Sequence, residues 1–226
     1  MIKAKQFNDA EALAQATVEL LANQLLFKSA QAIMLAGGST PMEAYRRLAA
    51  LKPRPAGDLH LFFSDDRHVP PDSPKSNYGN TRHLFNALGL GPEQIIRVYG
   101  EQPLTQAVEH YDRDLAALVE QGPRFSLGLL GLGADGHTAS LFTPAHVAQG
   151  RGRSAIGVDR PDGMQGVSVT SDFLLRIERL VFLVSGADKK PMTDALLRNT
   201  LSITAGLATA QHPNVELWMD KAAWPL

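Results

Sequence analysis

The sequence predicts an α/β protein with a mostly parallel, doubly wound, Rossmann-like sheet and helices on both faces. One observation is that short apolar runs of strand length alternate with longer stretches of helical period. Another is that several of these runs end in turns rich in glycine and polar residues, as at residues 37–40 and 131–137. The chain has 226 residues, 44% of them hydrophobic, so we expect residues 1–226 to form a single α/β domain.

The elements follow this alternation along the chain. Asn8 is placed to cap a first helix with an apolar stripe of helical period. A strand over residues 32–36 then leads into a helix over residues 42–51, which Thr40 is placed to cap. Further strands are expected at residues 59–63, 95–99, 125–130, 154–158, 166–170, 180–184 and 215–219, and further helices at 80–88, 103–121 and 187–198.

Composition excludes several classes of function. The formal net charge of −1 gives no basic surface for nucleic acid or an anionic membrane. The absence of cysteine excludes disulfides, thiolate catalysis and cysteine-ligated metals. The N-terminus lacks the apolar segment of a secretory signal, and no apolar run has the length of a membrane span. We therefore expect a cytoplasmic protein, a monomer or weak homodimer, that acts on a small molecule.

Residues 125–142 carry the most chemistry. Residues 125–130 are nearly all apolar, as expected of a strand buried on both faces, and a glycine-rich turn follows. Asp135 and His137, separated by Gly136, thus project from the carboxyl end of a central strand, where ligands bind in open α/β sheets. The alternative is a loop histidine without function, but its place beside Asp135 in a glycine turn favours a functional role.

The same turn also matches the dinucleotide fingerprint GxGxxG, with Asp159 at a plausible distance for a ribose-binding acid. That fingerprint normally opens a long crossover helix in a first βαβ unit. Here it lies past mid-chain, and residues 143–144 and 150–152 interrupt the segment that follows. We therefore favour a site that binds no dinucleotide.

A second candidate site is the turn of Gly37, Gly38, Ser39 and Thr40 between a strand and a helix. The N-terminus of a helix offers free N–H groups and the positive end of the helix dipole to an anion. An ordinary capped helix would carry the same residue types, and this alternative stays open.

A third cluster, Asp65, Asp66 and Arg67, follows another strand, and Ser76 and Asn77 follow the proline-rich loop after it. Such a charge cluster is often merely solvated, but its place at the end of a strand favours a role in a site. The carboxylates with His68 and His137 would also suggest a metal, but no metal-ligand spacing supports one, and we expect none.

Lys189 stands in the first turn of a predicted helix, where a cation is unfavourable unless it faces an anion. Because parallel strands direct their carboxyl ends to one edge, all these clusters are expected to share one rim of the sheet.

Three segments resemble those of the 6-phosphogluconolactonases, a family related to the glucosamine-6-phosphate deaminases and isomerases. They are LAGGSTP at residues 35–41, SDDRHVPPDSPKSNYGNTR at 64–82 and GLGADGHTASLF at 131–142, with weaker likeness at 167–170 and 184–190. The resemblance spans most of the chain in the same order. It implies a modified Rossmann-like fold, no required cofactor, and hydrolysis of 6-phospho-D-glucono-1,5-lactone to 6-phosphogluconate in the oxidative pentose phosphate pathway.

The resemblance also implies residue roles. It makes His137 the general base, places Asp65 and Arg67 in the substrate site, and assigns the glycine turn to the sugar phosphate. We expect Asp135 or Asp65 to orient the imidazole. The expected substrate-binding residues are Gly37, Gly38, Ser39, Thr40, Asp66, Ser76, Asn77, Gly136 and Lys189.

The chain departs from the family pattern at three positions. Asp66 stands where the family usually has Glu, and Thr143 intrudes before Pro144. Gly166 stands where the family usually has Arg before a VTLT-like strand. The cation that replaces this Arg is left open among Lys189, Arg160 and Arg153.

Two other functions remain as alternatives. A glucosamine-6-phosphate deaminase would share the scaffold, but those enzymes typically continue their histidine segment with an FNEP-like sequence, whereas TASLF follows here. A non-catalytic sugar-phosphate-binding regulator would usually carry a DNA-binding segment, and no helix-turn-helix or basic stripe is evident in the sequence.

Overall fold

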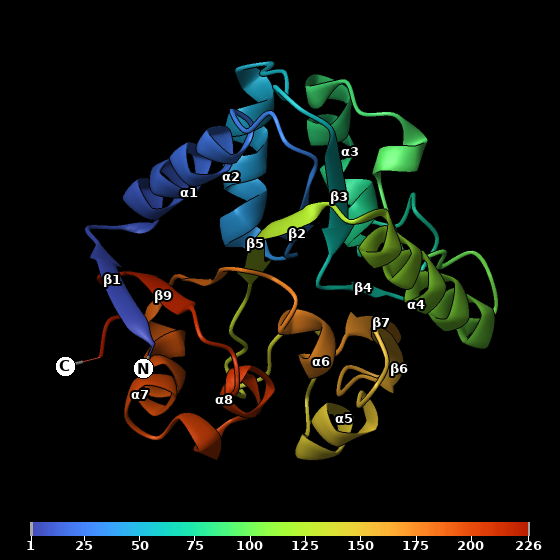
Figure 1. Cartoon of the computed structure of the whole chain (residues 1–226). Helices are drawn as coiled ribbons and strands as arrows, with labels where there is room; N and C mark the ends of the chain where they lie inside the picture. Colours follow the sequence, from blue (N-terminus) through green and yellow to red (C-terminus); the bar gives the residue numbers. More distant parts are fainter. Residues whose placement is uncertain (1, 226) are drawn as a thin grey trace.

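The computed structural model describes residues 2–225, and its centre is a six-stranded sheet in which neighbouring strands run parallel (Figure 1). In spatial order the strands are β1 (Lys3–Phe7), β9 (Val215–Asp220), β8 (Leu180–Val184), β5 (Arg124–Leu130), β2 (Gln31–Leu35) and β3 (Leu59–Phe63). The chain runs from β2 outward to β3 and later resumes on the other side of β2 with β5. The direction of winding therefore reverses between β2 and β5, which makes this a topological switch point. The predicted doubly wound parallel sheet is confirmed.

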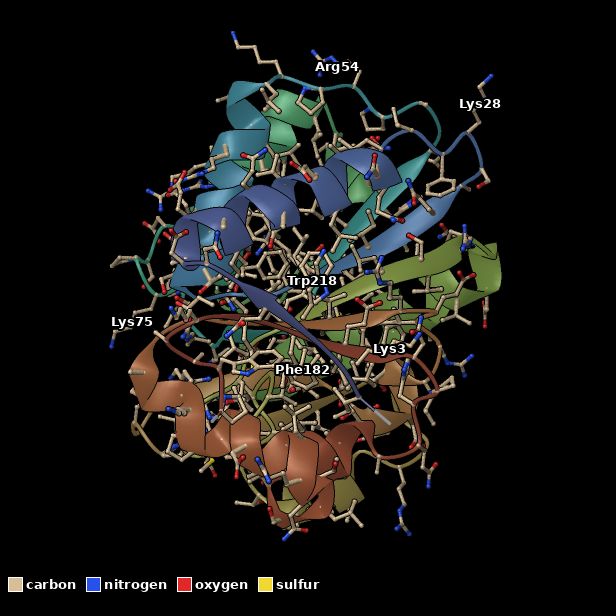
Figure 2. The ribbon with its side chains drawn as sticks, turned by 90° about the vertical axis from the view of Figure 1, so that its left-hand side faces the viewer. Lys3, Lys28, Arg54, Lys75, Phe182 and Trp218 are labelled. Carbon is tan, nitrogen blue, oxygen red and sulfur yellow. The ribbon has the colours of Figure 1, made fainter. Side chains whose placement is uncertain are left out.

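Helices cover both faces of this sheet. On one face lie α1 (Ala10–Gln24), α2 (Ser39–Ala50) and α3 (Asn77–Leu88), and on the other α4 (Leu104–Gln121) and α7 (Lys190–Arg198). Alternate strand residues enter the two cores: Ile33 and Leu35 pack on the first face and Met34 on the second. Figure 2 shows the same division, with Trp218 beneath α1 and Phe182 on the opposite side of the sheet. Burial on both faces explains the continuous apolar character of the central strands.

A small antiparallel sheet stands beside the large one. Its order is β4 (Asp65–Arg67), β7 (Gln165–Val169) and β6 (Ala155–Asp159). Only Ser64 separates β3 from β4, so the chain passes directly from one sheet to the other at this point. The remaining elements are α5 (Pro144–Gln149), α6 (Ser171–Leu174), α8 (Thr204–Thr209) and the 3₁₀ turns Pro92–Gln94, Ala187–Lys189 and Thr200–Ser202.

One predicted strand is absent from the structure, and two observed strands were not predicted. Residues 95–99 form no strand. Ile95 makes a single β-bridge to Leu61 of the edge strand β3, and its side chain packs against the hydrophobic core on that face of the sheet. β1 was not predicted, because KAKQF is a largely exposed edge strand without an apolar face. β4 was not predicted, because its three residues are all charged.

The helix caps also differ. Asp9, not Asn8, caps α1 by accepting from the Ala12 N–H at 2.8 Å. α2 begins at Ser39 after Gly38, whose φ of 101° favours glycine, so the predicted cap by Thr40 is wrong. α3 begins at residue 77 rather than 80, because the Ser76 hydroxyl accepts from the Gly79 N–H at 3.0 Å.

None of the helices within residues 2–225 combines the length and the apolar character needed to cross a lipid bilayer.

Candidate active site

A cavity of about 290 Å³ lies at the carboxyl edge of the large sheet, beside the switch point between β2 and β5. Separate strand ends supply its walls, as the sequence predicted. They are Ala36, Gly37 and Gly38 after β2, Ser64, Asp65 and Arg67 after β3, Gly131, Leu132, Gly133, His137 and Ala139 after β5, with Asn77, Arg160 and Lys189. Its volume is near the lower end of the range for small-molecule sites.

His137 and Asp135 form a hydrogen-bonded pair on the turn after β5. The His137 Nδ1 faces the Asp135 Oδ1, and the Asp135 Oδ1 also accepts from the His137 backbone N–H at 3.3 Å. A donor at Nδ1 leaves the Nε2 lone pair of a neutral imidazole free to accept a proton. Partial burial raises the pKa of the Asp135 carboxyl, but the hydrogen bond and charge of His137 outweigh burial and hold that pKa below its ordinary value.

Glycines make room for this pair. A Cβ at Gly133 would lie 2.1 Å from the His137 Nδ1 and 2.4 Å from the Asp135 Oδ1, so only glycine permits the contact. Gly136 has a φ of 84°, which lets the turn reverse between the two side chains. The Phe142 ring packs against the imidazole, with ring centroids 4.3 Å apart, and limits its movement.

Asp65 stands at the junction of the two sheets in a buried polar network. Its Oδ1 accepts from the Ser64 hydroxyl at 3.0 Å, and its Oδ2 accepts from the Ser140 hydroxyl at 2.7 Å. Arg160 donates to the Ser140 oxygen at 2.7 Å, and its guanidinium lies 3.8 Å from the Asp65 carboxylate. The network fixes a carboxylate and a guanidinium beside each other at the wall of the cavity.

Arg67 and Asn77 form another part of the wall. The Arg67 Nη1 donates to the Asn77 Oδ1 at 2.8 Å, and the Asn77 Nδ2 donates to the Asp65 carbonyl at 2.8 Å. Asn77 also fills the space beside Gly37, where an added Cβ would meet its amide at 2.2 Å. The backbone after β2, the strand β4 and the start of α3 are thereby packed together.

Asp66 points away from the cavity. It is buried, and its carboxylate accepts from the backbone N–H groups of Arg67, Asn77 and Tyr78 and from the Ser76 hydroxyl, at 2.7–3.1 Å. Burial raises the pKa of this carboxyl to about 6, against the opposing effect of these donors. Asp66 and Ser76 therefore anchor the start of α3, which carries Asn77, rather than lining the cavity.

The cavity carries excess positive charge. Arg67, Arg160 and Lys189 contribute three cations, and Asp65 contributes one carboxylate, among the residues that line it. The N-terminus of α2 adds its dipole on the same side, since Gly38 lines the cavity and no side chain in the described part of the chain caps this helix. Such a site favours an anion.

The structure brings seven of the sequence-predicted residues to the cavity wall: Gly37, Gly38, Asp65, Arg67, Asn77, His137 and Lys189. The other six do not line it, although each lies within two positions of a lining residue in the sequence: Ser39, Thr40, Asp66, Ser76, Asp135 and Gly136. Of the three cations left open, Lys189 and Arg160 reach the cavity, whereas Arg153 lies elsewhere, 3.3 Å from Asp112. Within residues 2–225, no cluster of three or more His, Asp or Glu side chains could hold a metal ion.

Ser64 and Ser140 were missed by sequence reasoning. Ser64 follows the apolar residues of β3 directly and Ser140 follows the histidine turn, so their positions next to known clusters were the available signal. Small hydroxyl residues are common at such places as simple caps, and only the three-dimensional network distinguishes these two.

Fold and site together define a doubly wound α/β protein with a histidine–carboxylate pair and a cavity wall rich in cationic side chains at its switch point. The chain belongs to the family of glucosamine-6-phosphate isomerases and 6-phosphogluconolactonases, whose model matches residues 6–217.

Curated relatives agree with this assignment. The chain is 33% identical to a 6-phosphogluconolactonase of Treponema pallidum, over 97% of this chain and 88% of the relative. It is 31% identical to one of Haemophilus influenzae, over 84% and 85% of the two chains. It is 32% identical to one of Homo sapiens, over 85% and 79%.

Solved structures share the fold over nearly the whole chain. A structure described as devB protein superposes with a TM-score of 0.86 at 28% identity, covering 99% of this chain and 98% of the other. A monomeric glucosamine-6-phosphate deaminase superposes with a TM-score of 0.82 at 20% identity, covering 98% of each chain. The second similarity, at this low identity, concerns the fold alone.

Proposed function

We propose that this protein hydrolyses 6-phospho-D-glucono-1,5-lactone to 6-phosphogluconate, with His137 as the general base. One observation carries the proposal: His137, backed by Asp135, lines the same cavity as three cations. The names of the curated relatives support the substrate. A phosphate monoester carries about −1.5 to −2 charges near neutral pH, which matches the excess positive charge of this wall.

Binding places the lactone for attack. The phosphate docks between the N-terminus of α2 and the cations of the cavity, where the N–H groups of Ser39 and Thr40, in the first turn, have no partner within the helix. The ring then extends toward His137, on the turn after the neighbouring strand. A fixed phosphate at one end therefore determines which carbonyl is presented to the base.

The reaction then needs one proton acceptor and one group that stabilises charge. The His137 Nε2 takes a proton from water as the water oxygen attacks C1, and Asp135 stabilises the imidazolium through Nδ1. Arg67 or backbone amides of the glycine turn stabilise the oxyanion that develops on the carbonyl. The bond between C1 and the ring oxygen breaks, the ring oxygen receives a proton from His137, and the acid product ionises. No covalent intermediate is required.

The test is His137→Ala, with turnover measured against spontaneous hydrolysis of fresh lactone. A general base contributes about 10²–10⁴-fold, so kcat should fall at least a hundredfold. His110→Ala is the matched control, because His110 lies on α4, packs on Tyr99 and does not line the cavity. A loss of kcat below about tenfold in the His137 variant would remove this residue from the role.

A second candidate is a glucosamine-6-phosphate deaminase, which the family description and the shared fold both allow. It needs the same phosphate grip and the same histidine, but it releases ammonia. Incubation with 6-phosphogluconolactone and, separately, glucosamine 6-phosphate distinguishes the two. Acid release alone supports the lactonase, ammonia release supports the deaminase, and neither supports a protein that only binds a sugar phosphate.

A further inference from the structure

Gly166 occupies a place where glycine is otherwise unfavourable. It lies within β7, paired with Arg67 of β4 and Val158 of β6. Its φ is not positive, so the backbone conformation does not require glycine. Glycine inside a strand weakens it and often marks the close approach of another group. The reason for glycine must therefore lie in its surroundings.

The group that approaches is the side chain of Arg160. A Cβ at Gly166 would lie 3.3 Å from the Arg160 Cδ, 3.4 Å from the Ser140 Oγ and 3.2 Å from the Asp66 carbonyl. The Arg160 side chain, only 8% exposed, starts at the end of β6, crosses this space and reaches the cavity wall. A longer side chain at Gly166 would occupy the path that Arg160 takes.

The guanidinium of Arg160 is held in a fixed orientation and still has N–H groups that could donate to a ligand. Its Nη1 donates to the Ser140 Oγ at 2.7 Å, its Nε and Nη2 donate to the Asp162 carboxylate at 3.2–3.3 Å, and it lies 5.1 Å from the Phe142 ring centroid. A guanidinium has five N–H groups. Three donate hydrogen bonds to these partners within residues 2–225, and the Asp65 Oδ2 lies 3.8 Å from Nη1, beyond hydrogen-bond distance. One N–H on each terminal nitrogen therefore has no hydrogen-bond acceptor among the described residues. Two parallel N–H groups are the arrangement that binds phosphate oxygens in a bidentate manner.

The other cations are less suited to this task. Lys189 is 25% exposed beside Asp188 and presents a flexible point charge. Arg67 donates to Asn77 and to the Lys75 carbonyl. Arg160 combines burial, a fixed orientation and a planar face.

We propose that Arg160 is the guanidinium that binds the substrate's phosphate, and that Gly166 is glycine because the Arg160 side chain must pass over it. This inference rests on the proposed function for the identity of the phosphate ester. It makes residues 160 and 166 a coupled pair in which only one can carry the arginine. An arginine at Gly166 would leave β7 beside the Ser140 Oγ, which is the position from which Arg160 now enters the cavity.

The test uses Arg160→Met, Gly166→Arg, and the exchange variant with Arg160→Gly and Gly166→Arg together. Each is assayed with 6-phosphogluconolactone and with unphosphorylated glucono-1,5-lactone. Loss of a charge-assisted pair should cost about tenfold or more in kcat/KM for the phosphorylated lactone. The unphosphorylated lactone should change by less than about threefold, whereas a merely structural role would lower both alike. The exchange variant should have a higher kcat/KM for the phosphorylated lactone than either single variant.

Arg153→Ala is the matched control, because Arg153 pairs with Asp112 and does not line the cavity. Thermal unfolding of every variant identifies any that do not fold.

A binding measurement that does not depend on catalysis separates this inference from the proposed function. Calorimetric titration with inorganic phosphate should show at least fivefold weaker binding by Arg160→Met than by the wild type. If the wild type hydrolyses no lactone, the proposed function fails and this titration still decides the role of Arg160. Equal losses for the two lactones, unchanged phosphate affinity, or an exchange variant worse than both single variants would overturn the inference.

Discussion

Asp66→Asn tests whether the buried Asp66 carboxylate anchors the start of α3, which carries the cavity residue Asn77. Four donors converge on the Asp66 carboxylate, two on each oxygen: the N–H groups of Arg67 and Asn77 on Oδ1, and the Ser76 hydroxyl and the Tyr78 N–H on Oδ2. In the Asn side chain one of these oxygens becomes an NH₂ group, which faces donors and cannot accept from them. A buried donor left unpaired costs about 1–3 kcal/mol.

The dependence on pH separates charge from geometry. Burial raises the pKa of the Asp66 carboxyl from an ordinary value of 3.8 to about 6. A folded pKa above the unfolded one means that the native state binds more protons between these values, so this group's contribution to stability falls as pH rises through the window. A difference of about 2.2 pKa units, at about 1.36 kcal/mol per unit, corresponds to about 3 kcal/mol in the free energy of unfolding. This contribution of Asp66 is present at low pH and is lost once the pH rises above 6.

The measurement is urea unfolding of the wild type and Asp66→Asn from pH 4.5 to 7.5. We expect the stability advantage of the wild type over the variant to shrink by about 2 kcal/mol between pH 4.5 and 7.5, because the rest of the effect falls below pH 4.5. The variant provides the matched control, because all other titrating groups are common to both proteins. An advantage that stays constant, or grows with pH, would refute the reasoning and show that the donors outweigh burial.

Two further predictions concern Gly37, which lines the cavity, and Asp135, which pairs with His137. Asp135→Asn should lower kcat at least tenfold with little change in KM, because the imidazole loses the carboxylate that orients its Nδ1. Steady-state kinetics with the lactone would measure both constants. An unchanged kcat would mean that Asp135 does not orient the base. Gly37→Ala should destabilise the fold by about 1–3 kcal/mol and raise KM, because the added Cβ would meet the Asn77 amide at 2.2 Å and displace Asn77, the partner of Arg67. Urea unfolding would measure the stability, and steady-state kinetics would measure KM. A variant with wild-type stability and KM would contradict this packing argument.

Much of the large sheet could be predicted from local pattern. Residues 59–63 and 180–184 form strands with the predicted bounds, because buried parallel strands carry continuous apolar runs with a clear beginning and end. The charged strand β4 and the edge strand β1 lack that signal, and the strands at residues 155–159 and 165–169 belong to the small antiparallel sheet. Their pairing depends on partners distant in sequence, which a local pattern does not contain.

The site divides in the same way. His137, Asp65 and Arg67 could be predicted because glycine turns and charges at strand ends mark the edge where parallel strands place ligands. Asp66, adjacent to both predicted wall residues, instead faces the start of α3. Since successive residues of a strand point to opposite sides, neighbouring carboxylates receive different surroundings, and sequence alone does not say which one faces the ligand.

The sequence by itself therefore determined the fold class, the family segments and the rim at which the polar clusters meet, because apolar period and turn chemistry are local properties. Only the tertiary structure decided which of the candidate cations reach the cavity: Lys189 and Arg160 do, and Arg153 does not. The path of Arg160 over Gly166 depends on the pairing of β6 with β7 and of β7 with β4. A side chain's reach is set by what lies across the sheet from it, and that information exists only after the chain has folded.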